Sequence, residues 1–401
     1  MGRFNPRWLT VTSPQQAVHE LNLVASDGCG VSAMAPKMLS RCIKLNGLKC
    51  HQANILKQEL LSVGGDAAVA RGTVACSIPA TDCILIGTDK QLLRLCHKLA
   101  AQPFGLAALA QELTALLEKS LHPPHIWRTS RRDLSLERPL IMGILNLTPD
   151  SFSDGGCFDT PEKALERARQ MEAEGADIID IGGESTRPGA AAVPSDRELA
   201  RIMPVLELLA GKLACAISVD TWKSTVADQA MATGAEIIND ISGFSFDPDM
   251  ATVAARHGAG VVLMHTRGTP DRMQQDTVYP DLMFEVTESL RYSVSLAQEA
   301  GIARERIAVD PGIGFAKECN GNLEILRRLD ELRTLGLPVL VGSSRKSFIG
   351  TVLGRPLSFD RLFGTAATVA IAVTNGASIL RVHDVRAMRD AADMARAVML
   401  A

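Results

Sequence analysis

Polar and charged residues stand at the ends of eight short apolar runs in residues 138–401. Each run is almost entirely apolar until its last positions, which are acids, bases, amides or hydroxyls. Side chains of these types are unusual inside a core and are the ones that bind and activate substrates. In chain order, the run-ending residues are Asn146, Glu184 to Thr186, Asp220, Asn239 with Asp240, His265, Asp310, Ser344 to Lys346, and Arg381 with His383.

The apolar runs predict the fold that positions these residues. Continuous stretches such as LIMGILN and GVVLMH are typical of strands buried on both faces, as in a parallel sheet. Helical segments separate the runs, and nearly all of these segments end in glycine; one begins at Thr160-Pro161 and stops at Gly175. We therefore predict an α/β fold, a (β/α)₈ TIM barrel, whose active site lies at the carboxyl ends of the strands.

One group of run-ending residues suits a flat heterocycle. Asp220, Asn239 and Asp310 end the third, fourth and sixth strands, so we expect them on one side of the barrel mouth. A carboxylate beside an amide matches a ring edge that presents several N–H donors in a row. An aminopyrimidinone has such an edge, and a carboxylate would accept two hydrogen bonds from it.

A second group suits a phosphate or diphosphate. Arg187, Arg381, His383 and Asn146 end the second, eighth and first strands, which adjoin where the barrel closes. Three residues that can carry positive charge would converge there, in the region where barrels often hold phosphate. Asn146 would offer an oxygen to Mg²⁺, which takes few protein ligands together with phosphate oxygens.

Each of these residues also has a structural explanation. An aspartate at a strand end can be only a helix N-cap or half of an ion pair, and we favour a structural role for Asp240 and His265. A whole rim of such residues is harder to explain by structure alone. Two long loops, residues 147–156 and 183–198, follow the first two strands and are longer than a connection needs, so we expect them to close over substrates.

Composition excludes several classes of partner. The net charge is −3 and the pI is about 6.3, which gives no electrostatic argument for nucleic acid or an anionic membrane. The N-terminal residues lack the apolar centre of a signal peptide, and no uncharged apolar stretch reaches about 18 residues. Nine cysteines without a C-x-x-C pair indicate reduced thiols and predict a cytoplasmic protein with no cysteine metal site.

The length, 401 residues, predicts a second unit beside the barrel. The charged, proline-containing segment 122–138 is the expected junction, with its two histidines solvated rather than bound to metal. We place a mixed α/β domain of unknown role in residues 1–133 and the catalytic barrel in residues 134–401. Gly64-Gly65-Asp66 is explained by a helix end and a turn, so packing, oligomerisation or regulation is the default role of the first domain.

The barrel segments resemble a known family, the dihydropteroate synthases. IMGILNLTPDSFSDGG and GADIIDIGGESTRPGA are similar to its two defining motifs. SVDT, NDISG, LMH, DPGIGFAK, GSSRKSFIG and RVHDV match its remaining blocks in order. The resemblance spans residues 138–401 and does not account for the N-terminal unit, which the simplest family members lack. It implies condensation of 6-hydroxymethyl-7,8-dihydropterin diphosphate with 4-aminobenzoate, giving 7,8-dihydropteroate and diphosphate.

The resemblance also implies roles for individual residues. It implies a pterin site of Asp220, Asn239, Asp310 and Lys346 with Met264 beside it, and a Mg²⁺-diphosphate site of Asn146, Arg187, Arg381 and His383. It implies an aminobenzoate pocket of Thr186, Pro188, Phe315, Lys346 and Ser347, with Phe152 closing over it. The catalytic set is then Asp220, Asp310, Lys346, Arg381 and His383, because two carboxylates stabilise a pterin cation while Mg²⁺, Arg381 and His383 stabilise the leaving diphosphate.

Two alternatives remain at this stage. A pterin-dependent methyltransferase on a similar barrel would share Asp220, Asn239 and Asp310, but it would have no use for the SSRKS block or for an anion site at Arg381 and His383. A non-catalytic pterin-binding protein would carry a degenerate site, whereas every block here is complete. The resemblance further suggests a homodimer that contacts its partner through the last helices.

Overall fold

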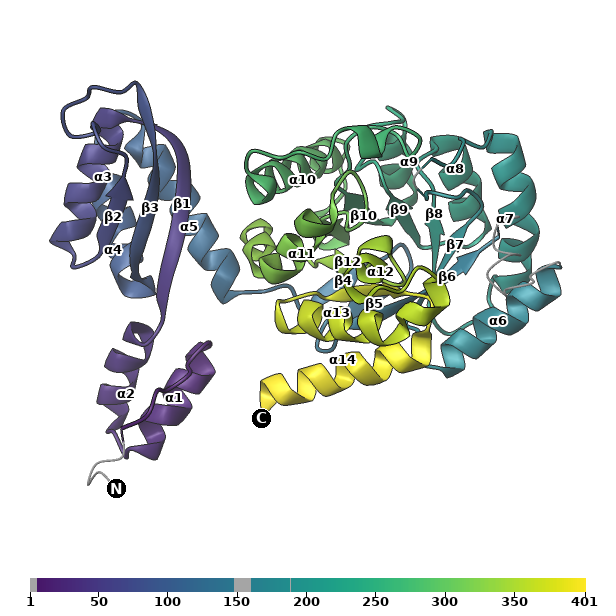
Figure 1. Cartoon of the computed structure of the whole chain (residues 1–401), viewed down its shortest axis with the longest axis horizontal. Coiled ribbons are helices and arrows are strands. Elements are labelled where there is room, and N and C mark those ends of the chain that lie inside the picture. The colour runs from purple at the N-terminus through teal and green to yellow at the C-terminus, as the bar shows by residue number, and fades with distance from the viewer. Residues whose placement is uncertain (1–5, 148–159, 188) are drawn as a thin grey trace. The chain divides into compact units, whose positions relative to one another are not determined.

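The computed structural model describes residues 6–147, 160–187 and 189–401. The chain divides into two compact units, Met1–His122 and Pro123–Ala401, each with its own sheet and apolar core (Figure 1). Residues 123–133, which the prediction assigns to the first domain, belong to the second unit, where Trp127 packs into the barrel.

The first unit is a mixed α/β domain. It begins with α1 (Pro14–Leu23), α2 (Gly28–Met34) and the short helix η1 (Ala35–Lys37). The elements that follow are β1 (Ser40–Lys49), α3 (Cys50–Ser62), β2 (Asp66–Val69), β3 (Ala80–Thr88), α4 (Asp89–Leu99) and α5 (Leu106–Leu121). The strands form an antiparallel sheet in the order β1-β3-β2.

Alternation along the central strand explains why this sheet is covered on one face. In β3, buried and exposed residues alternate strictly, with Cys83 and Leu85 fully buried and Ile84 and Ile86 about two fifths exposed. The buried face packs against leucines of α3, α4 and α5 to form one core. The opposite face of the sheet is turned away from these helices.

The second unit is the predicted barrel. Its strands are β6 (Leu140–Asn146), β7 (Ile178–Gly182), β8 (Ala216–Asp220), β9 (Ile237–Asp240), β10 (Gly260–Met264), β11 (Ile307–Asp310), β12 (Leu340–Val341) and β13 (Ile379–Val382). They pair in parallel in the order β11-β10-β9-β8-β7-β6-β13-β12. A parallel bridge between Val309 and Val339 joins the two ends of this sheet and closes it.

Helices follow the strands and form the outer layer. They are α6 (Pro161–Ala173), α7 (Ser195–Leu209), α8 (Ser224–Thr233), α9 (Met250–His257), α10 (Leu282–Glu299), α11 (Cys319–Arg327), α12 (Ser347–Leu353), α13 (Leu362–Thr374) and α14 (Val385–Leu400), with short helices η3 (Met273–Gln275), η4 (Arg304–Arg306), η5 (Leu329–Leu335) and η6 (Ser358–Arg361). As predicted, the Thr160 hydroxyl caps α6 and Pro161 is its first residue. Gly175 follows with φ of +99°, a conformation that glycine tolerates best.

A β-hairpin closes the amino-terminal end of the barrel. Strands β4 (Ile126–Arg128) and β5 (Asp133–Ser135) pair antiparallel and place Trp127, which is fully buried, against the first inward-facing residues of the barrel strands. The indole N–H donates a hydrogen bond of 3.0 Å to the Arg306 carbonyl. The bottom of the barrel is therefore filled, so ligand access is confined to the opposite, carboxyl-terminal end.

A cavity of about 640 Å³ lies at the same amino-terminal end, lined in part by Arg132, Arg138, Glu172 and Arg396. These side chains are engaged with neighbouring residues: Arg138 pairs with Asp177, and Glu172 accepts two backbone N–H groups. None of the predicted site residues lines it. We therefore assign it to the structure of the barrel base.

In the described part of the chain, no single helix is long and apolar enough to cross a membrane. Two consecutive helical segments, Ser347–Leu353 and Ser358–Thr374, would together be long and apolar enough, but they meet at an angle of 77°.

Candidate active site

Strand register brings the predicted residues together inside the barrel mouth. Along each strand every second side chain faces inward, and residues such as Ile237, Val262, Ala308 and Ile379 form the interior core. Two positions further along the same strands stand four predicted site residues: Asn239, Met264, Asp310 and Arg381. Asp220 occupies the corresponding position of β8 after Ala216 and Ser218, so these five side chains lie on the inner wall.

Arg381 lies at the centre of this wall and bridges two carboxylates. Its Nε donates to Asp180 Oδ2 and its terminal nitrogen donates to Asp220 Oδ2, both at 2.6 Å. Asn239 Nδ2 donates to the same Asp180 oxygen at 3.1 Å. The two predicted groups, one for the heterocycle and one for the anion, are therefore not separate, because Arg381 from the second group is paired with Asp220 from the first.

Asp180 is a site residue that sequence analysis missed. It is fully buried in the middle of β7 and touches both Arg381 and Asn239. The available signal was a charged residue inside an otherwise continuous apolar strand, IIDIG, rather than at its end. A buried charge in such a place is retained only with a partner, which Arg381 supplies.

Two carboxylate oxygens in this network are ready to accept hydrogen bonds from a ligand. Within the described residues, Asp180 Oδ1 and Asp220 Oδ1 are buried and have no hydrogen-bond partner. Burial raises the pKa of Asp220 to about 7, with Arg381 opposing this effect and Asp180 adding to it. Buried acceptors without partners are costly, so they favour a ligand that brings N–H donors.

A third carboxylate and a lysine contribute to this charge cluster: Asp310 at the end of β11 and Lys346 at the residue before α12. Asp310 Oδ1 accepts the backbone N–H of Gly312 at 2.7 Å, and burial raises the Asp310 pKa while Lys346 opposes that rise. Burial lowers the pKa of Lys346 to about 8, with Asp310 acting in the opposite direction. Asp310 and Lys346 thus each shift the pKa of the other.

An apolar surface adjoins these charges. Ile241, Met264, Met273, Phe315 and Ala316 form a small buried cluster, with Trp222 packed at its margin. The Lys346 ammonium lies 4.6 Å from the centroid of the Phe315 ring. This arrangement offers a flat aromatic ligand a surface on which to pack and a cation beside it.

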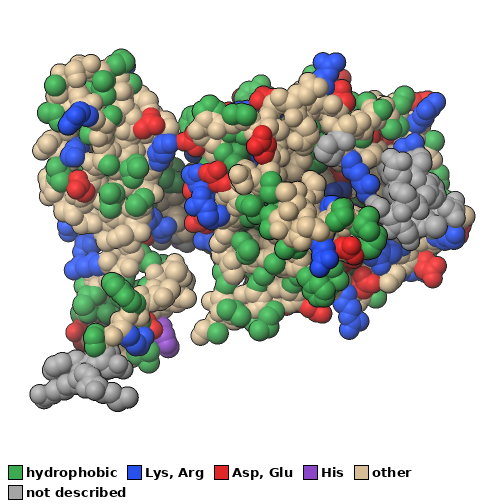
Figure 2. Space-filling view, in the orientation of Figure 1, with side chains coloured by type: hydrophobic (Ala, Val, Ile, Leu, Met, Phe, Trp, Pro, Cys, Tyr) green, Lys and Arg blue, Asp and Glu red, His purple; other side chains and the backbone are tan. Residues whose placement is uncertain are grey.

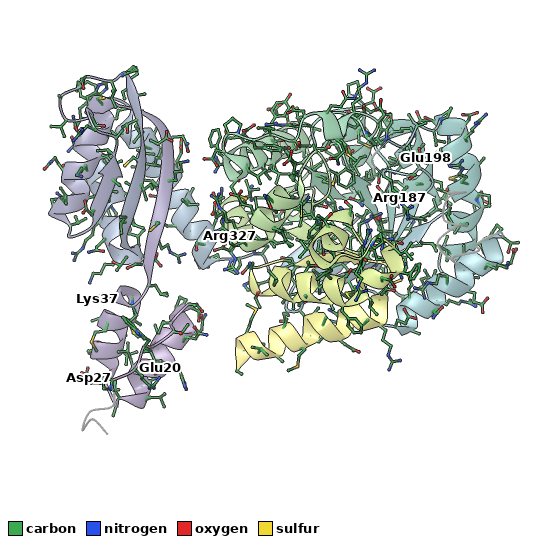
Figure 3. All side chains as sticks on the ribbon, viewed as in Figure 1. Glu20, Asp27, Lys37, Arg187, Glu198 and Arg327 are labelled. Atoms are coloured by element: carbon green, nitrogen blue, oxygen red, sulfur yellow. The ribbon has the colours of Figure 1, made fainter. Side chains whose placement is uncertain are left out.

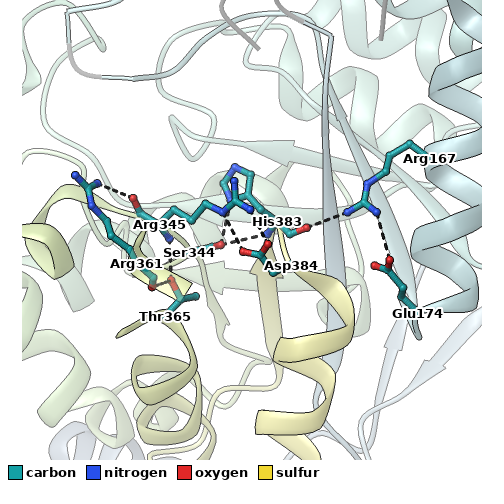
Figure 4. A network of polar contacts seen from close by, with 8 residues as sticks. All are labelled: Arg167, Glu174, Ser344, Arg345, Arg361, Thr365, His383 and Asp384. Carbon is teal, nitrogen blue, oxygen red and sulfur yellow. Dashed lines mark hydrogen bonds and ion pairs between the residues drawn. The ribbon is translucent and has the colours of Figure 1, made fainter. Parts of the chain in front are cut away.

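His383 is held in a network that keeps it neutral (Figure 4). Its Nδ1 lies 3.0 Å from Ser344 Oγ, and Arg345 beside it forms a two-point ion pair with Asp384. Burial, together with the nearby Arg345 and Arg381, lowers the pKa of His383 to about 3. We therefore expect the neutral form of His383 here, whereas the sequence analysis counted it among the residues that can carry positive charge.

The second long loop starts from a buried ionic cluster. Lys223 Nζ donates to Glu184 Oε2 at 2.7 Å and also to Glu198 Oε2, and all three side chains are buried. Glu184 Oε1 accepts the backbone N–H of Val193 at 2.7 Å, which ties the loop back to its beginning. Thr186 and Arg187 lie on this loop. Thr186 is half-buried, and Arg187, which is labelled in Figure 3, is exposed.

The remaining predicted residues have the following places. Asn146 ends β6, and a Cβ added at Gly182 would lie 3.4 Å from its carboxamide oxygen and 3.7 Å from Asp220 Oδ2. Ser347 is exposed at the first turn of α12. Phe152 and Pro188 lie outside the described residues. Asp240 is structural as favoured, because it accepts hydrogen bonds from the backbone of Ser242 and Phe244.

Comparison with known proteins decides the family. A family model described as pterin binding enzyme matches residues 142–383. The dihydropteroate synthase of Synechocystis sp. is 49% identical over 262 residues, which cover 65% of this chain and 91% of that protein. The chain belongs to the dihydropteroate synthase family. The predictions of a TIM barrel, a transferase and a function in folate biosynthesis are therefore confirmed.

Two further relatives extend the comparison. The structure of Xanthomonas albilineans dihydropteroate synthase with 4-aminobenzoic acid has a TM-score of 0.65 and 43% identity, covering 70% of this chain and 99% of that one. A probable bifunctional folylpolyglutamate synthase/dihydropteroate synthase of Halobacterium salinarum is 44% identical over 356 residues. That match covers 89% of this chain, and so extends into the N-terminal unit, but only 42% of the relative.

Proposed function

We propose that the barrel mouth condenses 6-hydroxymethyl-7,8-dihydropterin diphosphate with 4-aminobenzoate, with the residue roles given below. The observation that carries the proposal is the buried network of Asp180, Asp220, Asn239 and Arg381, with Asp310 and Lys346 across the mouth. Its orphaned carboxylate oxygens match the N–H donors of a pterin edge.

Asp220, Asn239 and Asp310 hold the pterin ring in this proposal, with Lys346 beside it. The ring has two flat faces, and Met264 supplies an apolar contact to one of them. The donor edge of the ring lies against carboxylates, so it gives charge-assisted hydrogen bonds, which are about twice as strong as neutral ones.

The same carboxylates help the reaction. When the bond between the pterin methylene carbon and the diphosphate oxygen breaks, positive charge spreads onto the ring nitrogens, and Asp220 and Asp310 stabilise it. The amine nitrogen of 4-aminobenzoate then bonds to that carbon and loses a proton, while diphosphate leaves with the electron pair of the broken bond. No protein nucleophile takes part, and the aminobenzoate packs against Phe315 near Lys346, Ser347 and Thr186, with Pro188 and Phe152 as further predicted contacts.

Arg381, Arg187, His383 and Asn146 take the diphosphate, with Mg²⁺ as the proposed cofactor. Among the described residues no cluster of three His, Cys, Asp or Glu side chains is placed to hold a metal. The donor set fits Mg²⁺ nevertheless, because Asn146 offers one amide oxygen near Asp220 and the diphosphate supplies the others. When bound, Mg²⁺ would neutralise charge that develops on the leaving group.

The functional test combines activity with one substitution. The purified chain should form 7,8-dihydropteroate and diphosphate from the two substrates, and excess EDTA should stop the reaction until Mg²⁺ is restored. No product from the wild-type chain would contradict the proposed reaction, and unaffected turnover in EDTA would contradict the metal.

Asp310→Asn should weaken binding of a pterin by about 2 kcal/mol, or roughly thirtyfold, because one charge-assisted hydrogen bond is lost. Calorimetric titration with 6-hydroxymethylpterin measures the effect. Asp330→Asn, at an exposed position on η5, serves as the matched control and should bind the pterin normally. Equal affinity of Asp310→Asn and the wild type would remove Asp310 from the pterin site.

We propose a homodimer that forms through the last helices. Several apolar side chains on α12, η6, α13 and α14 are exposed, namely Val352, Leu353, Phe359, Phe363, Met394 and Val398. Figure 2 shows apolar side chains gathered on the face of the barrel in view. A contiguous exposed apolar patch favours association. Sedimentation velocity should give a dimer for the wild type and a monomer for Phe363→Asp, whereas Tyr292→Asp on α10 should remain dimeric. A monomeric wild type would contradict the proposal.

A cytoplasmic location is proposed from the cysteines. Every cysteine in the described residues is free, and Cys50, Cys83, Cys96 and Cys215 are buried as thiols. Free thiols are typical of a reducing compartment. Cell fractionation of the native protein tests the location, and recovery outside the cytoplasm would overturn it.

A further inference from the structure

The turn after β11 is bonded by side chains of Lys317, which directly follows it, and of residues elsewhere in the barrel. Residues 312–316 contain three positive φ angles, at Gly312, Gly314 and Ala316. Ala316 is fully buried, with φ of +49°, a conformation that costs an alanine about 1 kcal/mol. A Cβ at Gly312 would overlap the His265 carbonyl oxygen. Such a turn persists only when its surroundings fix it.

Every carbonyl from residue 312 to residue 316 accepts a hydrogen bond from a side chain. Lys317 donates to Gly312 at 3.1 Å and to Phe315 at 3.0 Å, and Lys346 donates to Ile313. Gln274 donates to Gly314 at 3.4 Å, and the Tyr279 hydroxyl donates to Ala316 at 2.9 Å. Four side chains therefore donate hydrogen bonds to the turn: Lys346, Lys317, Gln274 and Tyr279.

Lys317 is the central member of this set because all three of its N–H bonds are used. Besides the two carbonyls, its ammonium lies 2.9 Å from His265 Nδ1, and the side chain is 4% exposed. Lys317 stands within one residue of the strained Ala316 and two of Phe315. Removing its ammonium would leave two buried carbonyls of the turn without this donor.

The contacts of Lys317 can form in either of its protonation states. Burial lowers the pKa of Lys317 to about 7; Asp310 opposes this, whereas Lys346 and Arg267 reinforce it. Burial also lowers the pKa of His265 well below its usual range, so its ring is neutral and Nδ1 is free to accept. If Lys317 loses its proton, the other His265 tautomer donates from Nδ1 to the lysine nitrogen, and all three contacts persist.

We propose that Lys317, with His265 and Tyr279, is a positioning residue that fixes the 312–316 turn so that Phe315 lies beside the Lys346 ammonium in the arylamine pocket. This inference rests on the proposed function. The backbone of Asp310 is held in β11, and its side chain touches the turn only through the Gly312 N–H, so we expect the turn to govern the aminobenzoate site more than the pterin site.

The test is a comparison of the two Michaelis constants in Lys317→Met. We expect the KM for 4-aminobenzoate to rise by tenfold or more, while the KM for the pterin diphosphate changes by less than about threefold. A merely structural role would lower the amount of folded enzyme without this split. Equal changes in both KM values, or an unchanged KM for aminobenzoate, would overturn the inference.

A second pair of variants keeps the inference testable if Lys317→Met does not fold. Tyr279→Phe removes only the hydroxyl that bonds Ala316 and keeps the ring that stacks on Arg267 at 3.7 Å. It should raise the KM for 4-aminobenzoate by about two- to fivefold, whereas Tyr292→Phe, at an exposed position on α10, should leave it unchanged. If Tyr279→Phe had the wild-type KM for 4-aminobenzoate, Tyr279 would not help to position the 312–316 turn.

These outcomes are distinguishable from failure of the proposed function. A wild-type chain that forms no dihydropteroate defeats the function itself. An active wild type whose Lys317 and Tyr279 variants show no selective loss for aminobenzoate defeats only the inference.

Discussion

Arg381→Met is expected to abolish measurable turnover and to destabilise the barrel by about 3–5 kcal/mol. The substitution leaves the Asp180 and Asp220 carboxylates side by side and buried, without the cation that now binds both. Breaking a buried pair by removing one partner typically has this effect, because an uncompensated charge remains. In the proposed mechanism Arg381 also donates to the departing diphosphate, and loss of that donor should lower kcat a hundredfold or more. Steady-state kinetics and urea unfolding measure the two parts.

The pH dependence of the variant's stability has a definite sign. The folded-state pKa of Asp220 is already raised to about 7 by burial, above the ordinary value of 3.8, and Arg381 holds it down. A carboxyl group with a raised folded pKa binds more protons in the folded state, so stability falls as pH rises between the two values. Without Arg381 the folded pKa rises further, and the fall should extend to higher pH.

Two comparisons make the Arg381 prediction specific. Asp220→Asn introduced into Arg381→Met should restore part of the lost stability, because one of the two unpaired charges is removed. It should not restore turnover, since both residues belong to the proposed site. Arg386→Met, at an exposed position on α14, should behave as wild type. If Arg381→Met were as stable as the wild type at pH 8, the bridge would not be an energetic element of the fold.

The barrel and the places of its site residues could be predicted because both follow from periodicity. Strands buried on both faces are continuous apolar runs, and inward-facing positions recur every second residue. Asp220, Asn239 and Asp310 were therefore predicted to lie on one rim, and the structure puts them there, whereas Met264 was predicted only through the family resemblance. Closure of the parallel sheet then brings β13, with Arg381, to the same mouth.

What the sequence could not supply is the pairing of side chains across the barrel. Arg381 contacts Asp180 on β7 and Asp220 on β8, neither of which neighbours β13 in the sheet, so the contact depends on how three side chains fill the interior. The neutral state of His383 likewise follows from burial and from Arg345, which no spacing reveals. Asp180 was not predicted because it stands inside β7, two residues before the strand ends.

The short hairpin before the barrel shows a different limit. Strand β4 has three residues and a single inward side chain, Trp127, so it has no periodic pattern to detect. Its charged surroundings resembled a linker, and the predicted boundary followed composition. The fold instead uses the tryptophan to fill the barrel base, which is a tertiary property.

The second large effect is expected for Lys223→Met, which should destabilise the barrel by about 3–5 kcal/mol. The lysine is buried between Glu184 and Glu198, and its removal leaves two buried carboxyl groups without a cation. Glu184 could then also lose its hydrogen bond with the backbone N–H of Val193. In the wild type this bond ties together the loop that carries Thr186 and Arg187. Thermal and urea unfolding measure the stability, and the KM values report on the loop.

The Lys223 cluster contains one more negative than positive charge, which makes Glu198→Gln a suitable control variant. Two carboxylates face one ammonium, Glu198 Oε1 is buried without a hydrogen-bond partner in the described chain, and burial raises the Glu198 pKa against the effect of Lys223. Glu198→Gln therefore removes the less well compensated charge and should change stability by less than about 1 kcal/mol. Lys212→Met, at an exposed position, controls for the loss of a lysine.

Comparing the single variant Lys223→Met with the double variant that also carries Glu198→Gln distinguishes a role in charge pairing from a role in packing. If the cluster works through charge, Glu198→Gln combined with Lys223→Met should be more stable than Lys223→Met alone, because one unpaired carboxylate has been neutralised. If Lys223 acts only by filling space, methionine, which is of similar length, should replace it with little loss. A Lys223→Met variant within 1 kcal/mol of the wild type, with unchanged KM values, would show that the second loop is positioned by other contacts.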